Sequence, residues 1–179
     1  EFPGGDIGRL AVCGTVNDLA VMGAKPAALS LALVIEEGLP LRVFDRLMGS
    51  IADAAAEAGV VIATGDTKVV ERRRGDGLTI TTSGIGEVRA DANLGTARIA
   101  EGDALLVTGL IAEHGLAVMS AREGLAFETQ LRSDVAPLGG VGGDVEQLRL
   151  VFAGDDQLEV PAHRRQLAHR GRQGALRFR

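Results

Sequence analysis

The sequence has one cysteine, no tryptophan and no tyrosine among its 179 residues. The single thiol, Cys13, excludes an intramolecular disulfide. With only three histidines, the chain also lacks a Cys/His cluster of the kind that holds zinc. Five phenylalanines are the only aromatic residues, so the core must be built from Ala, Val, Leu and Ile. The longest apolar run, residues 26–35, is far shorter than the roughly 20 residues that span a bilayer.

Charge and N-terminal composition exclude further classes of protein. The net charge of −5 lacks the basic excess that a general nucleic-acid-binding surface needs. The chain opens with Glu1, Phe2, Pro3 and two glycines, not with the basic and then apolar stretch of a signal peptide. We therefore expect a cytoplasmic protein that binds neither nucleic acid nor membrane.

Hydrophobic periodicity predicts an α/β unit in the first ninety residues. The expected elements are helices over 9–22 and 40–58 and strands over 26–35, 60–64 and 78–88. Pro40 suits the start of the second helix, and Gly59 suits its end. The charged stretch 71–77, with its Gly-Asp-Gly end, predicts a hairpin turn between the last two strands. Both helices are expected on one face of the sheet. Because the strands are too apolar to face water, we also expect the sheet to pair with that of a second copy.

The second half of the sequence is less regular. An apolar strand is expected at 104–108 and a short helix at 113–122, so a second α/β domain begins near residue 102. Glycines cluster at the start of 139–179, and from His163 onward there are six arginines and no acid. We predict that this tail is poorly ordered and divergent. The domains are then 1–101, 102–138 and 139–179.

Two short motifs contain the candidate functional residues. Asn17 and Asp18 lie on the first helix, where Asp18 shares a small, polar face with Ala11, Gly14 and Thr15, and Gly65-Asp66-Thr67-Lys68 follows a predicted strand. Aspartate can hold Mg²⁺, lysine can neutralise phosphate oxygens, and glycine lets the backbone approach a ligand. Both motifs also have ordinary interpretations, which are close helix–sheet packing and a simple turn. Neither a Walker A pattern nor a nucleophile set with Ser, Cys and His is present, and Cys13 is expected to be buried and inert.

Longer runs resemble one known family almost residue for residue. They are GGDIGRLAVCGTVNDLAVMGAKP (4–26), TGDTKVVE (64–71), EHGLAVMSAREGLAFE (113–128) and SDVAPL (133–138). Together they resemble HypE, a hydrogenase maturation family within the aminoimidazole-ribonucleotide-synthetase, or PurM-like, superfamily. The GDTKVV stretch differs from the corresponding motifs of purine-pathway synthetases and thiamine-phosphate kinases. The resemblance covers residues 3–138; it lacks the family's first strand and leaves 139–179 unmatched.

The resemblance implies a fold and an activity. Its fold is an ATP-binding, dimerising N-terminal domain with a mixed sheet and packed helices, followed by a second α/β domain. HypE proteins use ATP to dehydrate a carbamoyl group on their own C-terminal cysteine to a thiocyanate, which supplies the cyanide of a [NiFe] hydrogenase. The implied partners are a second copy, the carbamoyltransferase HypF and the HypC–HypD complex. The family's C-terminal substrate-carrying cysteine is absent from this sequence, so whether this chain is itself an enzyme stays open.

The resemblance also gives the matched residues roles. Asp66 and Lys68 are implied as catalytic residues, and Asp18 with Asp66 as ligands of Mg²⁺. The expected nucleotide contacts are Asp18 together with Thr15, Asn17, Gly65 and Thr67. Two alternatives remain at this stage. One is another ATP-using member of the superfamily, of the selenophosphate synthetase or thiamine-phosphate kinase type, and the other is a non-catalytic dimerisation or binding module.

Overall fold

A computed structural model describes residues 1–90, 92, 94–101, 112–124 and 131–138. Its elements in chain order are α1 (Ile7–Val21), β1 (Ala24–Glu36), α2 (Leu41–Ala58), β2 (Val61–Val70), β3 (Leu78–Val88), the 3₁₀ helix η1 (Thr96–Arg98) and α3 (Glu113–Glu123). The strand expected at 104–108, the boundary near residue 102 and the segment 139–179 lie outside the described residues. No helix in the described ranges is long and apolar enough to cross a membrane.

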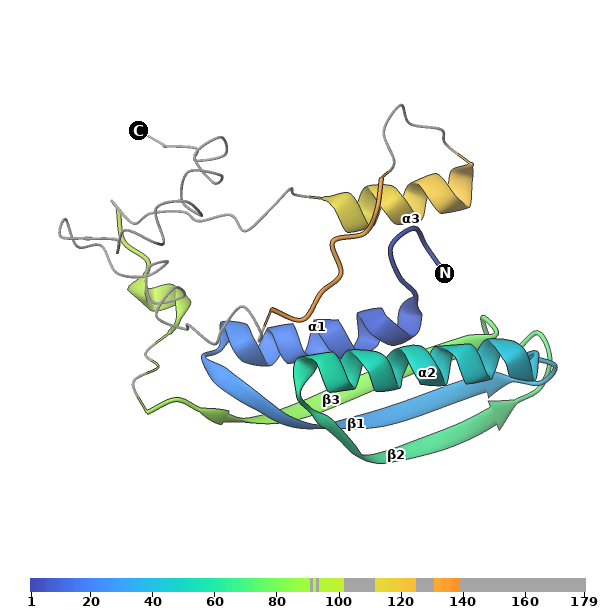
Figure 1. Ribbon diagram of the computed structural model, residues 1–179, viewed down its shortest axis with the longest axis horizontal. Helices are drawn as coiled ribbons and strands as arrows, with labels where there is room; N and C mark the ends of the chain where they lie inside the picture. Colours follow the sequence, from blue (N-terminus) through green and yellow to red (C-terminus); the bar gives the residue numbers. More distant parts are fainter. Residues whose placement is uncertain (91, 93, 102–111, 125–130, 139–179) are drawn as a thin grey trace.

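The three strands form one mixed sheet in the order β2-β1-β3. The central strand β1 pairs in parallel with β2 and antiparallel with β3. Helices α1 and α2 both cover the same face of this sheet, and no described element covers the other (Figure 1). The predicted α/β unit, with its two helices on one face, is therefore confirmed.

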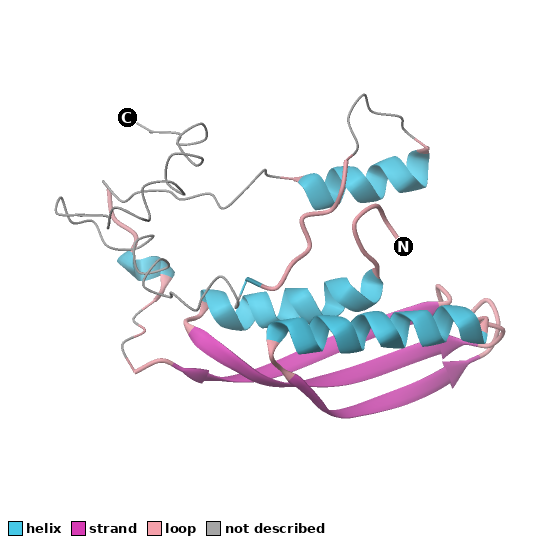
Figure 2. Cartoon of the chain, viewed as in Figure 1, coloured by secondary structure: helices cyan, strands magenta, loops and turns pink. Residues whose placement is uncertain are grey.

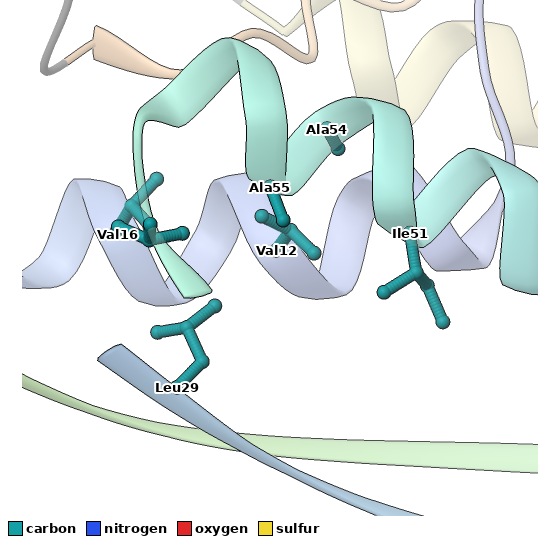
Figure 3. Close-up of a cluster of buried hydrophobic side chains, with 7 residues drawn as sticks. Val12, Val16, Leu29, Ile51, Ala54 and Ala55 are labelled. Carbon is teal, nitrogen blue, oxygen red and sulfur yellow. The ribbon is translucent and has the colours of Figure 1, made fainter. Parts of the chain in front are cut away.

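The main core lies between the two helices and the sheet (Figure 3). Val12 and Val16 of α1 meet Leu29 of β1, and all three side chains are almost fully buried. Ala54 of α2 is 0% exposed, so its small side chain lets the two helices approach closely. Because these aliphatic residues recur at helical spacing, the sequence determines which faces are buried.

Helix α1 begins two residues earlier than predicted because Asp6 caps it. Its Oδ1 accepts hydrogen bonds from the backbone N–H groups of Gly8 at 2.8 Å and Arg9 at 3.0 Å. The same oxygen accepts from the hydroxyl of Ser50 on α2 at 2.8 Å. One carboxylate therefore satisfies free amides at the helix start and also joins the two helices.

Strand β2 is longer than the expected 60–64, and this corrects the location of the second motif. The strand runs from Val61 to Val70, so Asp66 and Lys68 lie within it and do not follow its end. Polar residues are tolerated there because β2 is an edge strand with one uncovered face. The alternation of Thr64, Asp66 and Lys68 is the period-two pattern of such a strand.

The predicted hairpin at 71–77 is wrong. Strands β2 and β3 do not pair, because β1 lies between them, and 71–77 crosses the end of β1 instead. The Glu36 carboxylate, at the end of β1, accepts hydrogen bonds from the backbone N–H groups of Arg73 at 2.6 Å and Gly77 at 3.3 Å. These hydrogen bonds, above all the one from Arg73, lower the pKa of Glu36 because they stabilise its ionised form. The ionised carboxylate thus anchors the crossing loop.

The expected short helix is confirmed as α3. His114 in its first turn contacts the ring of Phe2 edge-on, with the ring centroids 4.9 Å apart. The Nδ1 atom of His114 lies 2.9 Å from the hydroxyl of Ser133. Figure 2 shows the segment 131–138 as an extended loop that passes from the region of α3 down to α1. The N-terminal residues, α3 and this segment therefore pack together above α1.

Candidate nucleotide-binding site

The uncovered face of the sheet is defined by the strand register. Leu29, Leu31 and Leu33 of β1 pack against the helices. Side chains alternate along a strand, so Ser30, Ala32 and Val34 point to the other face. Residues directly opposite each other in a sheet share a face. The neighbours of these three β1 residues therefore form the open face, which consists of Thr64, Asp66 and Lys68 on β2 and Ser83, Thr81 and Thr79 on β3.

Asp66 and Lys68 lie together on this open face. Asp66 is opposite Ala32, which is in turn opposite Thr81, and Lys68 is opposite Val34. Two residues along a strand are roughly 7 Å apart, so the carboxylate and the ammonium can reach one ligand. Both residues are exposed, and the small neighbours leave space above the sheet. The sequence interpretation missed Ala32 and Thr81, although the alternation of apolar and polar residues over Leu78–Ser83 could have indicated the exposed face to which Thr81 belongs.

The Asp66 side chain is oriented by its own strand. Its Oδ1 accepts a hydrogen bond from the backbone N–H of Thr67 at 2.9 Å. The Thr67 side chain itself belongs to the opposite face, because Thr67 pairs with Leu33. Thr67 therefore contributes its backbone at the open face, and a contact from its hydroxyl to a nucleotide there is not supported by this register.

Gly65 has a packing role in the structure. It pairs with Leu31 just after a register shift between β1 and β2. A side-chain carbon at Gly65 would collide with the carbonyl oxygen of Leu31. Glycine is thus needed for β2 to approach β1 closely, whereas its predicted contact with a nucleotide stays a prediction.

Thr15 joins α1 to the sheet. Its hydroxyl lies 2.6 Å from the hydroxyl of Thr82, which donates to the carbonyl oxygen of Ala11 at 2.9 Å. Since Thr82 has one hydroxyl proton, Thr15 is the donor in the first bond. The polar face that the sequence suggested for a ligand is therefore partly used in helix–sheet packing, as the alternative interpretation expected.

Asn17 is also engaged within the chain. Its Nδ2 donates to the carbonyl oxygen of Ala136 at 3.0 Å, and its Oδ1 accepts from the backbone N–H of Leu138 at 2.7 Å. The next residue, Asp18, is exposed, as is Gly14 one turn earlier. The exposed part of α1 thus presents a carboxylate beside a side chain that holds the segment 136–138.

One chain does not bring the predicted groups to a single place. Asp18 lies on α1, which covers one face of the sheet (Figure 1), while the strand register places the side chains of Asp66 and Lys68 on the other face. In the described ranges, no group of three or more acidic, histidine or cysteine side chains could hold a metal ion by itself. A Mg²⁺ ion at Asp66 would therefore need further oxygen ligands, which nucleotide phosphates can supply.

Comparison with known proteins places this fold and these motifs. Residues 2–88 match the model of the family described as AIR synthase related protein, N-terminal domain. The chain is 53% identical over 160 residues to the carbamoyl dehydratase HypE of Cupriavidus necator. That match includes 89% of this chain and 45% of the relative. An alignment of this length extends into the segment 139–179. This relative therefore does not support the expectation that the segment is unrelated to the family.

Solved structures agree with these matches. The crystal structure of a HypE–HypF complex superposes with a TM-score of 0.80 and 52% identity, covering 83% of this chain and 48% of that one. A HypE structure in complex with ATP gives a TM-score of 0.78 and 47% identity, covering 81% and 43%. The chain belongs to the AIR synthase related, PurM-like proteins. Within that class it belongs to the HypE family of hydrogenase maturation proteins. It spans about half the length of its curated relatives.

Proposed function

We propose that this chain provides the ATP-binding part of a HypE carbamoyl dehydratase and works in [NiFe] hydrogenase maturation. The observation that carries the proposal is the pair Asp66 and Lys68 on the open sheet face, above small neighbours. It is supported by membership of a family in which one relative's structure contains ATP. Asp66 would hold Mg²⁺, and Lys68 would neutralise the phosphate oxygens.

The proposed reaction explains the need for these groups. A carbamoyl group on a thiol, S–C(=O)–NH₂, loses its oxygen and both nitrogen-bound protons to become S–C≡N. Hydroxide is a poor leaving group, so the amide oxygen first takes the γ-phosphoryl group of ATP and then departs as phosphate. This transfer depends on positioning and on neutralising charge at the phosphate. Lys68 and a cation at Asp66 suit that requirement.

Cys13 does not fit the role of carrier thiol in this reaction. Cys13 is 1% exposed and lies on the buried side of α1. Burial raises the pKa of the Cys13 thiol, which disfavours the nucleophilic thiolate. The proposed reaction therefore needs a carrier thiol that is not Cys13, and this sequence contains no other cysteine.

A second copy would complete the site. The open sheet face has no described covering element, and it presents small residues that a second sheet can approach. We place Asp66 and Lys68 of the edge strand β2 of one copy and Asp18 of the other around each nucleotide, at the rim of the paired sheets, because one chain keeps these groups on opposite faces. The open face is less apolar than the strand sequences suggested, since Thr and Ser line much of it, so apolar burial alone is a weaker reason for pairing.

Further partners follow from the family. One relative was crystallised as a HypE–HypF complex, and we extend that partnership to this chain, with HypF supplying the carbamoyl group. The HypC–HypD complex would receive the product. A cytoplasmic location is part of the same proposal.

Titration with ATP tests the proposed function. The chain should bind ATP when Mg²⁺ is present. Chelation of Mg²⁺ should weaken ATP binding by roughly tenfold or more, because without the cation the negative phosphates repel the Asp66 carboxylate. Isothermal calorimetry with and without a chelator measures this difference. Equal affinity under both conditions would remove the metal from the proposal, and no binding in either would remove the nucleotide.

A further inference from the structure

The segment 131–138, which we term the strap, is held to the rest of the chain at several points. At its start, the backbone N–H of Ser133 donates to the carbonyl oxygen of Pro3 at 2.7 Å. Gly4, with a φ of +96°, lies so close that a side-chain carbon there would be 2.8 Å from the Ser133 nitrogen. Pro137, near the end of the strap, is buried. The strap is therefore a packed part of the molecule despite its lack of regular secondary structure.

Two residues on one stripe of α1 hold the strap's backbone. Arg9 donates from Nε to the carbonyl oxygen of Val135 at 3.2 Å, while its two terminal nitrogens bind the Glu57 carboxylate at 2.6 and 3.0 Å. Asn17 lies about two helical turns further along. Its carboxamide makes the two bonds to Ala136 and Leu138 described above.

The Asn17 contact has a specific chemistry. A carboxamide that donates to one carbonyl and accepts from an N–H two residues later mimics the pairing of a neighbouring strand. Both ends of the side chain are engaged, since Nδ2 and Oδ1 each bond to strap backbone. Asp18, the next residue on the same helix, is the proposed metal ligand of α1. The strap therefore ends beside the part of α1 that the nucleotide would contact.

We infer that Asn17 is a positioning residue that fixes the strap to α1 and so couples the strap to the nucleotide site at Asp18. The coupling rests on the proposed function, whereas the attachment of the strap rests on the contacts alone. The family-based expectation made Asn17 a nucleotide contact; here it acts on the nucleotide through the strap. Coupling between two sites is reciprocal, so bound nucleotide should also hold the strap more tightly.

Two substitutions break the same contact from opposite sides. Asn17→Ala removes the carboxamide, while Leu138→Pro removes the strap N–H and leaves α1 and Asn17 intact. Hydrogen exchange read out at the Ser133 amide reports strap opening in both, and we expect exchange about tenfold faster, in line with the loss of one to two net hydrogen bonds. ATP affinity in the presence of Mg²⁺ should fall about fivefold in each variant, and no further in the double variant. Circular dichroism and the melting temperature check that each variant folds.

The outcomes separate the possibilities. Equal losses of ATP affinity in both variants, without additivity, support the positioning role. Weaker ATP binding in Asn17→Ala alone would mean that the carboxamide touches the nucleotide directly, which overturns it. Unchanged Ser133 exchange in both variants would also overturn it. If the wild-type chain binds no ATP, the proposed function and the coupling fail, but faster Ser133 exchange in the two variants would still support the attachment of the strap by Asn17.

Discussion

An Asp66→Ala chain should lose its Mg²⁺-dependent affinity for ATP while remaining folded. Substituting residues that merely support a metal ligand typically costs 10- to 100-fold in metal affinity, so loss of the ligand itself should weaken ATP binding by roughly 100-fold. Folding should be nearly unaffected, because Asp66 is exposed and its one described bond is to the adjacent N–H of Thr67. Calorimetric titration with Mg²⁺ and ATP measures the first effect, and urea unfolding measures the second.

The matched control is Asp53→Ala. Asp53 is an exposed aspartate on α2, in the layer on the other side of the sheet, so its removal changes net charge equally without touching the open face. It should bind ATP like the wild type. If Asp66→Ala and Asp53→Ala bound ATP with the same affinity, Asp66 would not belong to the site. Asp66→Asn should behave like Asp66→Ala, because an amide is a poor substitute for a carboxylate at a divalent cation.

Placing an arginine at the centre of the open sheet face should convert the proposed dimer to a monomer. Ala32 is exposed in the single chain and lies between Asp66 and Thr81. In Ala32→Arg the new side chain extends into water in the monomer, so the fold should tolerate it. In a sheet-to-sheet dimer it would meet the second copy, with an expected rise in the dimer dissociation constant of roughly 100-fold or more.

Sedimentation velocity over a range of concentrations measures this equilibrium. Ala52→Arg is the control, since Ala52 is an exposed alanine on α2, in the layer remote from the open face. It should sediment as the wild type does. A dimer that survives Ala32→Arg would mean that the copies pair through another surface, and a wild-type monomer at high concentration would mean that they do not pair at all.

The sequence predicted the fold well where burial repeats at a regular spacing. Leu29 and Leu33 of β1 and Ile51 and Ala55 of α2 are buried as expected, because aliphatic side chains that recur at a fixed period leave water together, whereas Val34 and Leu41 are exposed. The prediction of the strand end failed for β2, because the polar residues Thr64, Asp66 and Lys68 resembled residues that follow a strand. They are the exposed half of an edge strand.

Contacts between distant segments could not be predicted from local patterns. The turn-like stretch 71–77 indicates a reversal of the chain, but not that β1 takes the place between β2 and β3. Asn17 is an extreme case, because its bonding partners lie about 120 residues further along the chain. The sequence identified the residues of the two motifs, whereas only the fold shows that Asp18 and Asp66 lie on opposite sides of the sheet.

Mixing two inactive variants tests the two-copy site most directly. Asp18→Ala and Asp66→Ala should each fail to bind Mg²⁺–ATP alone, because every site in either dimer lacks one carboxylate. After subunit exchange, a mixed dimer contains one site with both carboxylates, so about a quarter of all sites should regain wild-type affinity. Recovery of binding on mixing is the predicted result. If both variants stay folded and exchange subunits but the mixture binds no more ATP than its components, Asp18 and Asp66 do not meet across two copies.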